Sequence, residues 1–173
     1  GRIGRVVVMG GSAMVGGNIT PAAEFNAFAD PHAARIVLRS GIPVTLCGLD
    51  VTYDCGLTHA DIAALAQAGP VSRAYHEMLT VYADGSYKTR ALVSAHDVAT
   101  IAWLLSPALF EGRGMPVDVC CDAGPCLGET VCDRRWWRYD EHAQPVRVLT
   151  RVSAEGVSAL LLDALHTLDA RMA

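Results

Sequence analysis

One short segment of the sequence concentrates side chains that can hold a ligand rich in hydroxyl groups. Asn18, Glu24 and Asn26 place two amides and a carboxylate within nine residues. They follow an apolar run that is typical of a buried strand, and open α/β sheets bind ligands beside the ends of their strands. Amides and carboxylates can bond several hydroxyls of a sugar ring at once. The segment indicates a sugar-binding loop, with capping and bracing of the loop itself as the alternative.

A second candidate is the pair His96 and Asp97, which stands where we expect a helix to begin. A carboxylate at that place could bind a hard cation, and a histidine can transfer a proton near neutral pH. A capping aspartate beside a surface histidine explains the same two residues. Both interpretations stay open on the sequence alone.

Two further segments could bind nucleotides or bases. Gly10–Gly17 is rich in glycine, which lets backbone N–H groups approach a phosphate, but it has neither a Gly-Lys-Ser/Thr ending nor a G-x-G-x-x-G pattern. We interpret it as a turn, and a generic nucleotide-binding α/β domain remains an alternative with poor loop chemistry. Arg134–Tyr139 could stack on bases, but the neighbouring Asp133 and Asp140 favour a subunit contact or a solvated loop.

The elements that must position these residues begin with a strand, a helix and a second strand. Arg5–Met9 is a short β-branched run, and Pro43–Leu49 is another. Between them, Asp30 suits a helix cap, Pro31 the first helical position and Gly41 the stop. Because parallel strands need a long connection, this order predicts a crossover unit of a parallel sheet.

The rest of the chain continues the alternation of helices and strands. Thr58 and Asp61 predict a capped helix that ends at Gly69-Pro70. Further helices are expected over 72–82, 99–105 and 153–171, and short strands over 117–121, 129–132 and 146–150. We predict an α/β fold, with a Rossmann-like, mostly parallel sheet flanked by helices, in a single domain over residues 1–173.

Composition and charge narrow the classes of function. The 173 residues are 51% hydrophobic and 18% charged, with a net charge of −4, so nucleic acid is not an expected partner. Neither a membrane-spanning run nor a signal pattern is found, and we expect a cytoplasmic location without membrane association. The six cysteines lack the spacing of a zinc site and are expected to be reduced, as small core hydrophobes.

Taken together, the motifs resemble those of the inosine-uridine preferring nucleoside hydrolases. The most specific is the run Gly17-Asn18-Ile19-Thr20-Pro21-Ala22-Ala23-Glu24-Phe25-Asn26. Their order and spacing agree over nearly the whole chain. The other carrying segments are Val7–Ser12, Asp30–Ala34, Leu49–Thr52, His96-Asp97 and Gly128–Asp133.

The resemblance implies hydrolysis of the N-glycosidic bond of a ribonucleoside to free base and ribose, assisted by calcium. It implies that Asn18, Glu24 and Asn26 hold ribose hydroxyls. His96 matches the position that gives a proton to the departing base, and Asp97 matches a calcium ligand. Tyr75, His76, Tyr82 and Tyr87 are candidates for stacking on the base.

The sequence also departs from the family pattern. It contains no Asp-x-Asp-x-x-x-Asp-Asp motif and no Gly-Pro-Leu-Thr-Asn segment, which supply most calcium ligands in the family, so the calcium site is expected to be incomplete. We therefore expect the C-terminal portion of a hydrolase, with a fold incomplete relative to the family. A homo-oligomer, or association with a missing N-terminal part, follows from that expectation. The alternative is a catalytically incomplete remnant that binds ribose or a nucleoside.

Overall fold

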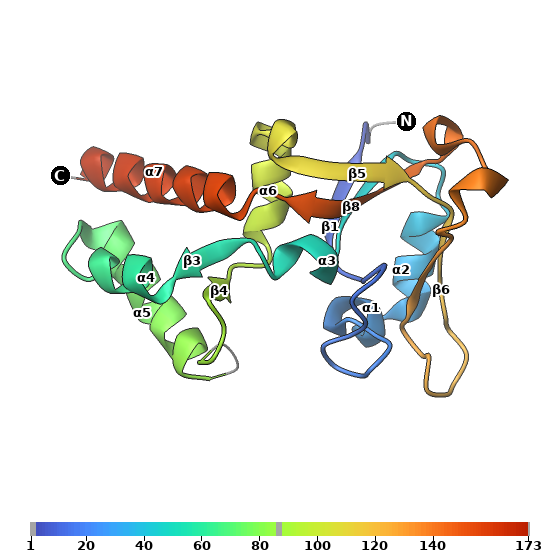
Figure 1. Ribbon diagram of the computed structural model, residues 1–173, viewed down its shortest axis with the longest axis horizontal. Helices are drawn as coiled ribbons and strands as arrows, with labels where there is room; N and C mark the ends of the chain where they lie inside the picture. The colour runs from blue at the N-terminus through green and yellow to red at the C-terminus, as the bar shows by residue number, and fades with distance from the viewer. Residues whose placement is uncertain (1–2, 86–87, 173) are drawn as a thin grey trace. The chain divides into compact units, whose positions relative to one another are not determined.

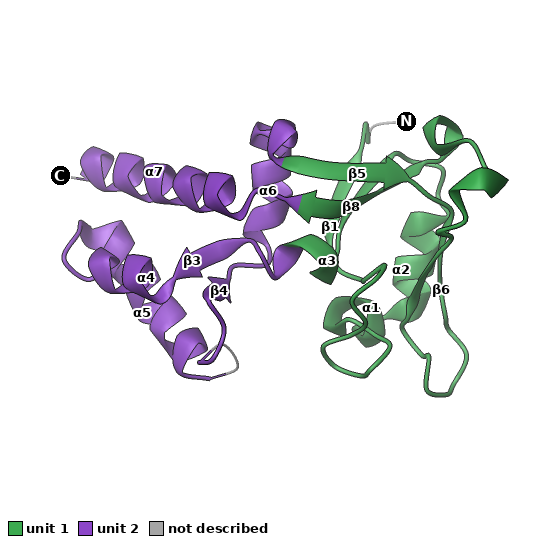
Figure 2. Ribbon diagram, viewed as in Figure 1, with its two compact units in different colours: residues 1–51, 110–151 green, residues 52–109, 152–173 purple. Residues whose placement is uncertain are grey.

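The computed structural model describes residues 3–85 and 88–172. The chain divides into two compact units, which Figure 2 distinguishes by colour. Unit 1 comprises residues 1–51 and 110–151, and unit 2 comprises residues 52–109 and 152–173. We describe each unit by itself, and the single domain over residues 1–173 stays a prediction.

Unit 1 is built on a four-stranded sheet with the order β1-β2-β8-β5 (Figure 1). β1 (Val6–Met9) pairs with β2 (Val44–Cys47) in parallel, and β2 pairs with β8 (Val146–Val152) in parallel. The fourth strand, β5 (Phe110–Gly114), was not predicted. Every residue of β2 is buried, as expected for a strand inside a parallel sheet.

Two helices follow β1 in unit 1. The short α1 (Phe25–Ala29), which was not predicted, begins after Glu24, and α2 (Pro31–Leu38) begins after Asp30, whose side chain accepts from Ala33 N at 2.9 Å. The predicted cap and the proline at the first helical turn are therefore confirmed for α2. Leu38 joins the other side chains of the unit 1 core, which are Val44, Leu46, Met115, Val119, Val146 and Val148.

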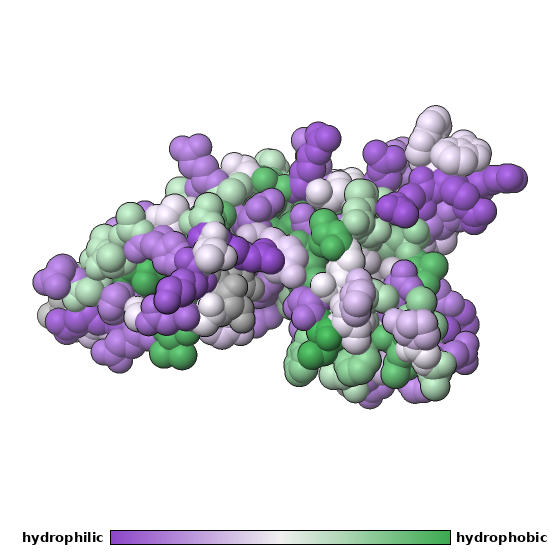
Figure 3. All heavy atoms as spheres, turned by 60° about the horizontal axis from the view of Figure 1, so that its bottom comes forward, coloured by the Kyte–Doolittle hydropathy of each residue, from purple (hydrophilic) through white to green (hydrophobic). Residues whose placement is uncertain are grey.

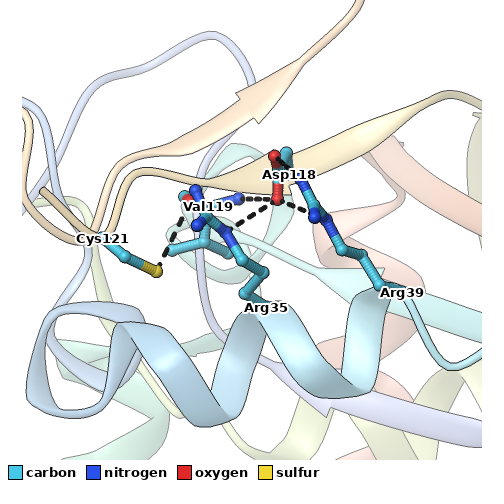
Figure 4. Close-up of polar contacts among 5 residues, drawn as sticks. All are labelled: Arg35, Arg39, Asp118, Val119 and Cys121. Atoms are coloured by element: carbon cyan, nitrogen blue, oxygen red, sulfur yellow. Dashed lines mark hydrogen bonds and ion pairs between the residues drawn. The ribbon is translucent and has the colours of Figure 1, made fainter.

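A separate antiparallel hairpin packs against α2 in unit 1. β6 (Val117–Val119) pairs with β7 (Thr130–Cys132), so these two predicted strands exist but do not join the parallel sheet. Arg35 and Arg39 of the α2 segment both form ion pairs with Asp118 of the hairpin (Figure 4). Burial alone would raise the pKa of Asp118, but the hydrogen bond from Arg39 and the charge of Arg35 lower it. After the hairpin come two 3-10 turns, η2 (Trp136–Arg138) and η3 (Glu141–Ala143).

Unit 2 packs helices around a two-stranded antiparallel sheet of β3 (Gly56–Thr58) and β4 (Leu92–Ser94) (Figure 1). These two short strands were not predicted. The helices are α4 (His59–Leu65), α5 (Pro70–Asp84), α6 (Val98–Leu105) and α7 (Ala154–Met172), with a 3-10 turn η1 (Pro107–Leu109). The short α3 (Leu49–Thr52) leads into the unit. The core is formed by Leu57, Ile62, Leu65, Leu79, Ala83, Val93 and Leu165.

The ends of two helices in unit 2 follow from their caps. Thr58 and Asp61 form the expected capping box at the start of α4, but the helix ends at Leu65 rather than near Gly69. α5 starts directly at Pro70, because Asp169 accepts hydrogen bonds from Val71 N at 2.7 Å and Ser72 N at 3.2 Å. A carboxylate of α7 therefore caps α5 across a long stretch of sequence.

The burial of the cysteines and of other apolar side chains tests the predictions made from the composition. Cys47 and Cys55 are buried, which confirms the expectation of core cysteines for these two, whereas the exposed Cys126 contradicts it. Hydrophobic residues also reach the surface, as the green patches of Figure 3 show. Ile36 is 71% exposed and Val81 is 76% exposed. Among the described residues, no helix is both long and apolar enough to cross a membrane.

Candidate active site

The three predicted sugar-binding residues lie in one hydrogen-bonded loop at the carboxyl end of β1, in unit 1. Asn18 Oδ1 accepts from the backbone N–H of Phe25 at 2.9 Å. Asn26 Nδ2 donates to the carbonyl oxygen of Met9, the last residue of β1, at 3.3 Å. The segment Asn18–Asn26 is thereby closed on itself and tied to the strand, so the side chains of Asn18, Glu24 and Asn26 are brought together.

The buried carboxylate of Glu24 holds the loop after β1 together through hydrogen bonds. Its side chain is only 2% exposed. Oε1 accepts from Asn26 N at 2.9 Å, while Oε2 accepts from Gly11 N at 2.9 Å and Ala27 N at 3.1 Å. The carboxylate therefore caps α1 and joins it to the turn after β1, which is the capping role left open by the sequence. A carboxylate has about four acceptor positions, so these three bonds leave room for a ligand hydroxyl.

The two amides keep complementary groups for a ligand. Asn18 uses its oxygen internally, and its Nδ2 donor makes no hydrogen bond to any residue that the structure describes. Asn26 uses its nitrogen, and its Oδ1 acceptor has no partner in the same ranges. Both residues are exposed. The loop thus presents one donor and one acceptor beside a carboxylate, a set that suits vicinal hydroxyls.

The glycine-rich turn after β1 binds the chain's own side chains through its backbone N–H groups. Ser12 N donates to Thr130 Oγ1 at 2.8 Å, and Ala13 N and Met14 N donate to the Asp50 carboxylate, both at 2.7 Å. Together with the bond from Gly11 to Glu24 described above, four consecutive N–H groups are engaged. A phosphate would need such groups unoccupied. The glycine-rich turn therefore does not support the alternative of a generic nucleotide-binding domain.

Close packing explains one glycine of this turn. Gly11 has a φ of +68°, and a Cβ at its position would lie 2.7 Å from Cγ2 of Thr130. A residue with a side chain would meet both backbone strain and a clash. Gly11 thus allows Thr130 to hold the loop, since Thr130 Oγ1 also donates to the Ser12 carbonyl oxygen.

His96 and Asp97 lie in unit 2, between the end of β4 and the start of α6. Nδ1 of His96 is 2.8 Å from Oγ1 of Thr52, and the His96 ring meets the ring of Tyr53 edge-on at 5.7 Å. Asp97 is exposed and is the N-cap residue of α6, but its side chain makes no capping hydrogen bond. The carboxylate is therefore not explained by the capping interpretation.

Both residues line a pocket of about 370 Å³ in unit 2. Tyr75 and Tyr82 of α5 line the same pocket, and their stacking on a base stays a prediction. His76 does not, because its Nδ1 donates to the Ile62 carbonyl oxygen at 2.7 Å. Tyr87 lies outside the described residues.

The residues present do not fit a complete calcium site. Calcium takes six to eight oxygen ligands. In residues 3–85 and 88–172 the structure brings together no group of three or more His, Cys, Asp or Glu side chains that could hold a metal ion. Asp97 alone supplies one carboxylate, and a single carboxylate supports no catalytic step through calcium.

Sequence reasoning gave no role to three residues that organise these sites. Asp50, Thr52 and Thr130 were quoted as parts of motifs, yet their partners lie 37, 44 and 118 residues away in the chain. No local pattern identifies such pairs. Their positions within the segments that carry the family resemblance were the available signal.

The family of the chain follows from comparison with known proteins. The family model of the inosine-uridine preferring nucleoside hydrolases matches residues 1–159. Pyrimidine-specific ribonucleoside hydrolase RihA of Shewanella sp. (strain ANA-3) is 43% identical over 170 residues, 95% of this chain and 52% of the relative. RihA of Photobacterium profundum, also named as pyrimidine-specific, is 38% identical over 169 residues, 95% of this chain and 53% of the relative. The chain thus spans about half the length of these relatives.

Solved structures agree with this result. A plant nucleoside hydrolase superposes with a TM-score of 0.83 at 28% identity, covering 94% of this chain and 54% of that protein. The purine-preferring ribonucleoside hydrolase from Gardnerella vaginalis gives 0.85 at 26% identity, covering 96% of this chain and 53% of that protein. The α/β fold with a mostly parallel sheet is confirmed. The chain belongs to the inosine-uridine preferring nucleoside hydrolase family.

Proposed function

We propose that the whole protein hydrolyses the N-glycosidic bond of ribonucleosides to free base and ribose. The observation that carries this proposal is the 43% identity to a pyrimidine-specific ribonucleoside hydrolase over 95% of the chain. Because both RihA relatives are named as pyrimidine-specific, uridine and cytidine are the proposed substrates. The donor, acceptor and carboxylate in the loop after β1 support a sugar ligand.

In this reaction water attacks C1′ of the ribose, the bond from C1′ to the base nitrogen breaks, and the base leaves with the electron pair. The proton that the attacking water loses ends on the base. Positive charge develops on the sugar in an oxocarbenium-like transition state. Asn18, Glu24 and Asn26 would hold the ribose hydroxyls and orient the ring. His96 would donate from its ring N–H to the base nitrogen, since a base stabilised by a donor leaves more readily than a free anion.

The test is release of ribose from uridine, cytidine and inosine by the whole protein, measured as reducing sugar. We expect faster release from the two pyrimidine nucleosides. The matched variants are Asn26→Ala, which removes the exposed acceptor, and His32→Ala, a change at an exposed residue of α2 to which no role is assigned. Asn26→Ala should raise KM, whereas His32→Ala should behave as wild type. No release of ribose from any of these nucleosides would overturn the proposal.

A second candidate is a non-catalytic module that binds ribose or a nucleoside. The observation in its favour is that the described residues do not make up a calcium site. Calorimetric titration of ribose and uridine separates the two, because saturable binding without hydrolysis by the whole protein would favour the module. For the enzyme, we propose that Asp97 contributes one carboxylate to a calcium site.

Association with a further polypeptide surface is also proposed, either a second copy or an adjoining part of the protein. It is supported by three exposed apolar side chains of α6, namely Ile101, Leu104 and Leu105, the last of which is 67% exposed. Light scattering coupled to size exclusion measures the assembly, and a monodisperse monomer would oppose a homo-oligomer. A cytoplasmic location stays a prediction that cell fractionation tests.

A further inference from the structure

The segment that follows α3 is fastened to the end of β4 by hydrogen bonds, all within unit 2. Ser94 Oγ donates to the Tyr53 carbonyl oxygen at 2.9 Å, and Ala95 N donates to the Cys55 carbonyl oxygen at 2.7 Å. Ser94 is 2% exposed and Cys55 is fully buried. His96 directly follows Ala95, so these hydrogen bonds fix the position of the backbone at His96.

Thr52 makes the next contact in this series, to the imidazole itself. Its Oγ1 lies 2.8 Å from Nδ1 of His96. Thr52 has no exposed surface, and Oγ1 has no other hydrogen-bond partner in the described part of the chain. A buried hydroxyl proton without an acceptor is costly. The Thr52 hydroxyl must therefore donate, and Nδ1 of His96 must accept.

That direction fixes the tautomer of the ring. A neutral imidazole carries one proton, so an Nδ1 that accepts leaves the proton on Nε2. Tyr53 packs edge-on against the ring with an interplanar angle of 67°, which limits rotation of the ring about its Cβ bond. The contacts thus define both the plane of the ring and the nitrogen that bears hydrogen.

We propose that Thr52 is a positioning residue that holds neutral His96 in its Nε2–H form, so that Nε2 donates a hydrogen bond to the departing base. The inference rests on the proposed function, in which His96 assists departure of the base. Thr52 itself touches neither substrate nor reacting atoms. It contributes by excluding the Nδ1–H form, in which the proton would sit on the nitrogen that faces Thr52.

The first test measures the tautomer and needs no activity. Nitrogen-15 chemical shifts and long-range proton couplings of the histidine rings distinguish Nε2–H from Nδ1–H, and His96→Gln identifies the His96 signals. At mildly alkaline pH, we expect the Nε2–H form in the wild type and in Thr52→Ser, and a mixture in Thr52→Val. An Nδ1–H wild type, or an unchanged tautomer in folded Thr52→Val, would overturn the inference. If Thr52→Val does not fold, the wild-type tautomer decides.

The second test uses the whole protein and two leaving groups. Uracil needs a proton to leave well, whereas 4-nitrophenolate is stable as an anion. Loss of one positioning hydrogen bond should lower kcat for uridine by about tenfold in Thr52→Val, with less than about twofold change for 4-nitrophenyl riboside. Thr52→Ser should restore the uridine rate. Equal losses on both substrates would show a merely structural role and refute the inference.

The two tests separate the inference from the proposed function. If the wild type hydrolyses neither compound, the proposed function fails, while the ring nitrogens still report whether Thr52 sets the tautomer. If hydrolysis occurs and the tautomer is Nδ1–H, the inference fails alone.

Discussion

The buried carboxylate of Glu24 offers the sharpest test of how the loop after β1 is held. Glu24→Gln preserves shape but leaves one acceptor oxygen where there were two. The three N–H groups of Gly11, Asn26 and Ala27 converge on those oxygens, so at least one of them would face an amide NH₂. A buried donor without an acceptor costs about 1–3 kcal/mol. We expect Glu24→Gln to lower the free energy of unfolding by about 2 kcal/mol.

Glu24→Ala removes all three acceptor contacts and should cost about 4 kcal/mol, which is a large fraction of the total stability of a typical domain. Urea unfolding followed by circular dichroism measures both variants, with an unchanged m value as the sign that only stability differs. Asn18→Ala is the matched control, because Asn18 is exposed and accepts a single bond from Phe25 N. It should cost less than about 1 kcal/mol.

A Glu24→Gln protein as stable as the wild type would refute this reasoning. The three hydrogen bonds would then contribute nothing net to stability. A variant that keeps its stability but loses affinity for ribose would instead assign the carboxylate to the ligand alone.

Three further outcomes are expected. The hydrogen bond from Ser72 lowers the pKa of Asp169 despite the opposing effect of burial, so its contribution is present above the unfolded-state pKa of about 3.9 and is lost as pH falls through the lower folded-state value. The difference in urea midpoint between the wild type and Asp169→Asn should therefore shrink in acid; a difference that grows there would be contrary to expectation. Burial raises the pKa of Cys47 to about 12, whereas Cys126 is exposed and its pKa is raised mainly by a hydrogen bond to Glu129, so iodoacetamide should modify Cys126 before Cys47, as mass spectrometry can show; labelling of Cys47 before Cys126 would contradict this ordering. Calcium and EDTA should leave the melting temperature of the 173-residue chain unchanged, since its described residues form no calcium cage, and a calcium-dependent rise would reveal a site that these contacts do not explain.

Local chemistry made much of the fold predictable from the sequence. The cap of α2 at Asp30 and the capping box of Thr58 and Asp61 depend on residues three positions apart, so a short stretch of sequence is enough to predict them. The β-branched runs over 5–9 and 43–49 likewise predicted the parallel strands β1 and β2, but only β2 is fully buried, as β1 is partly buried throughout. The family resemblance rested on motifs of the same local kind.

Short elements were less predictable. β3, β4 and α1 have three to five residues each, too few for a periodic pattern. They form because distant segments supply their partners, as when β3 pairs with β4 across more than thirty residues. The pairing of β6 with β7 outside the main sheet was decided in the same way.

The sequence by itself determined the family, the α/β class and the chemical types of the candidate site residues: amides, a carboxylate and a histidine. Only the tertiary structure decided that Glu24 caps α1, that Asp50 fills the turn after β1, and that Thr52 bonds His96. The reason is physical. Residue type fixes what a side chain can donate or accept, but burial and the approach of distant backbone fix which of those bonds it makes.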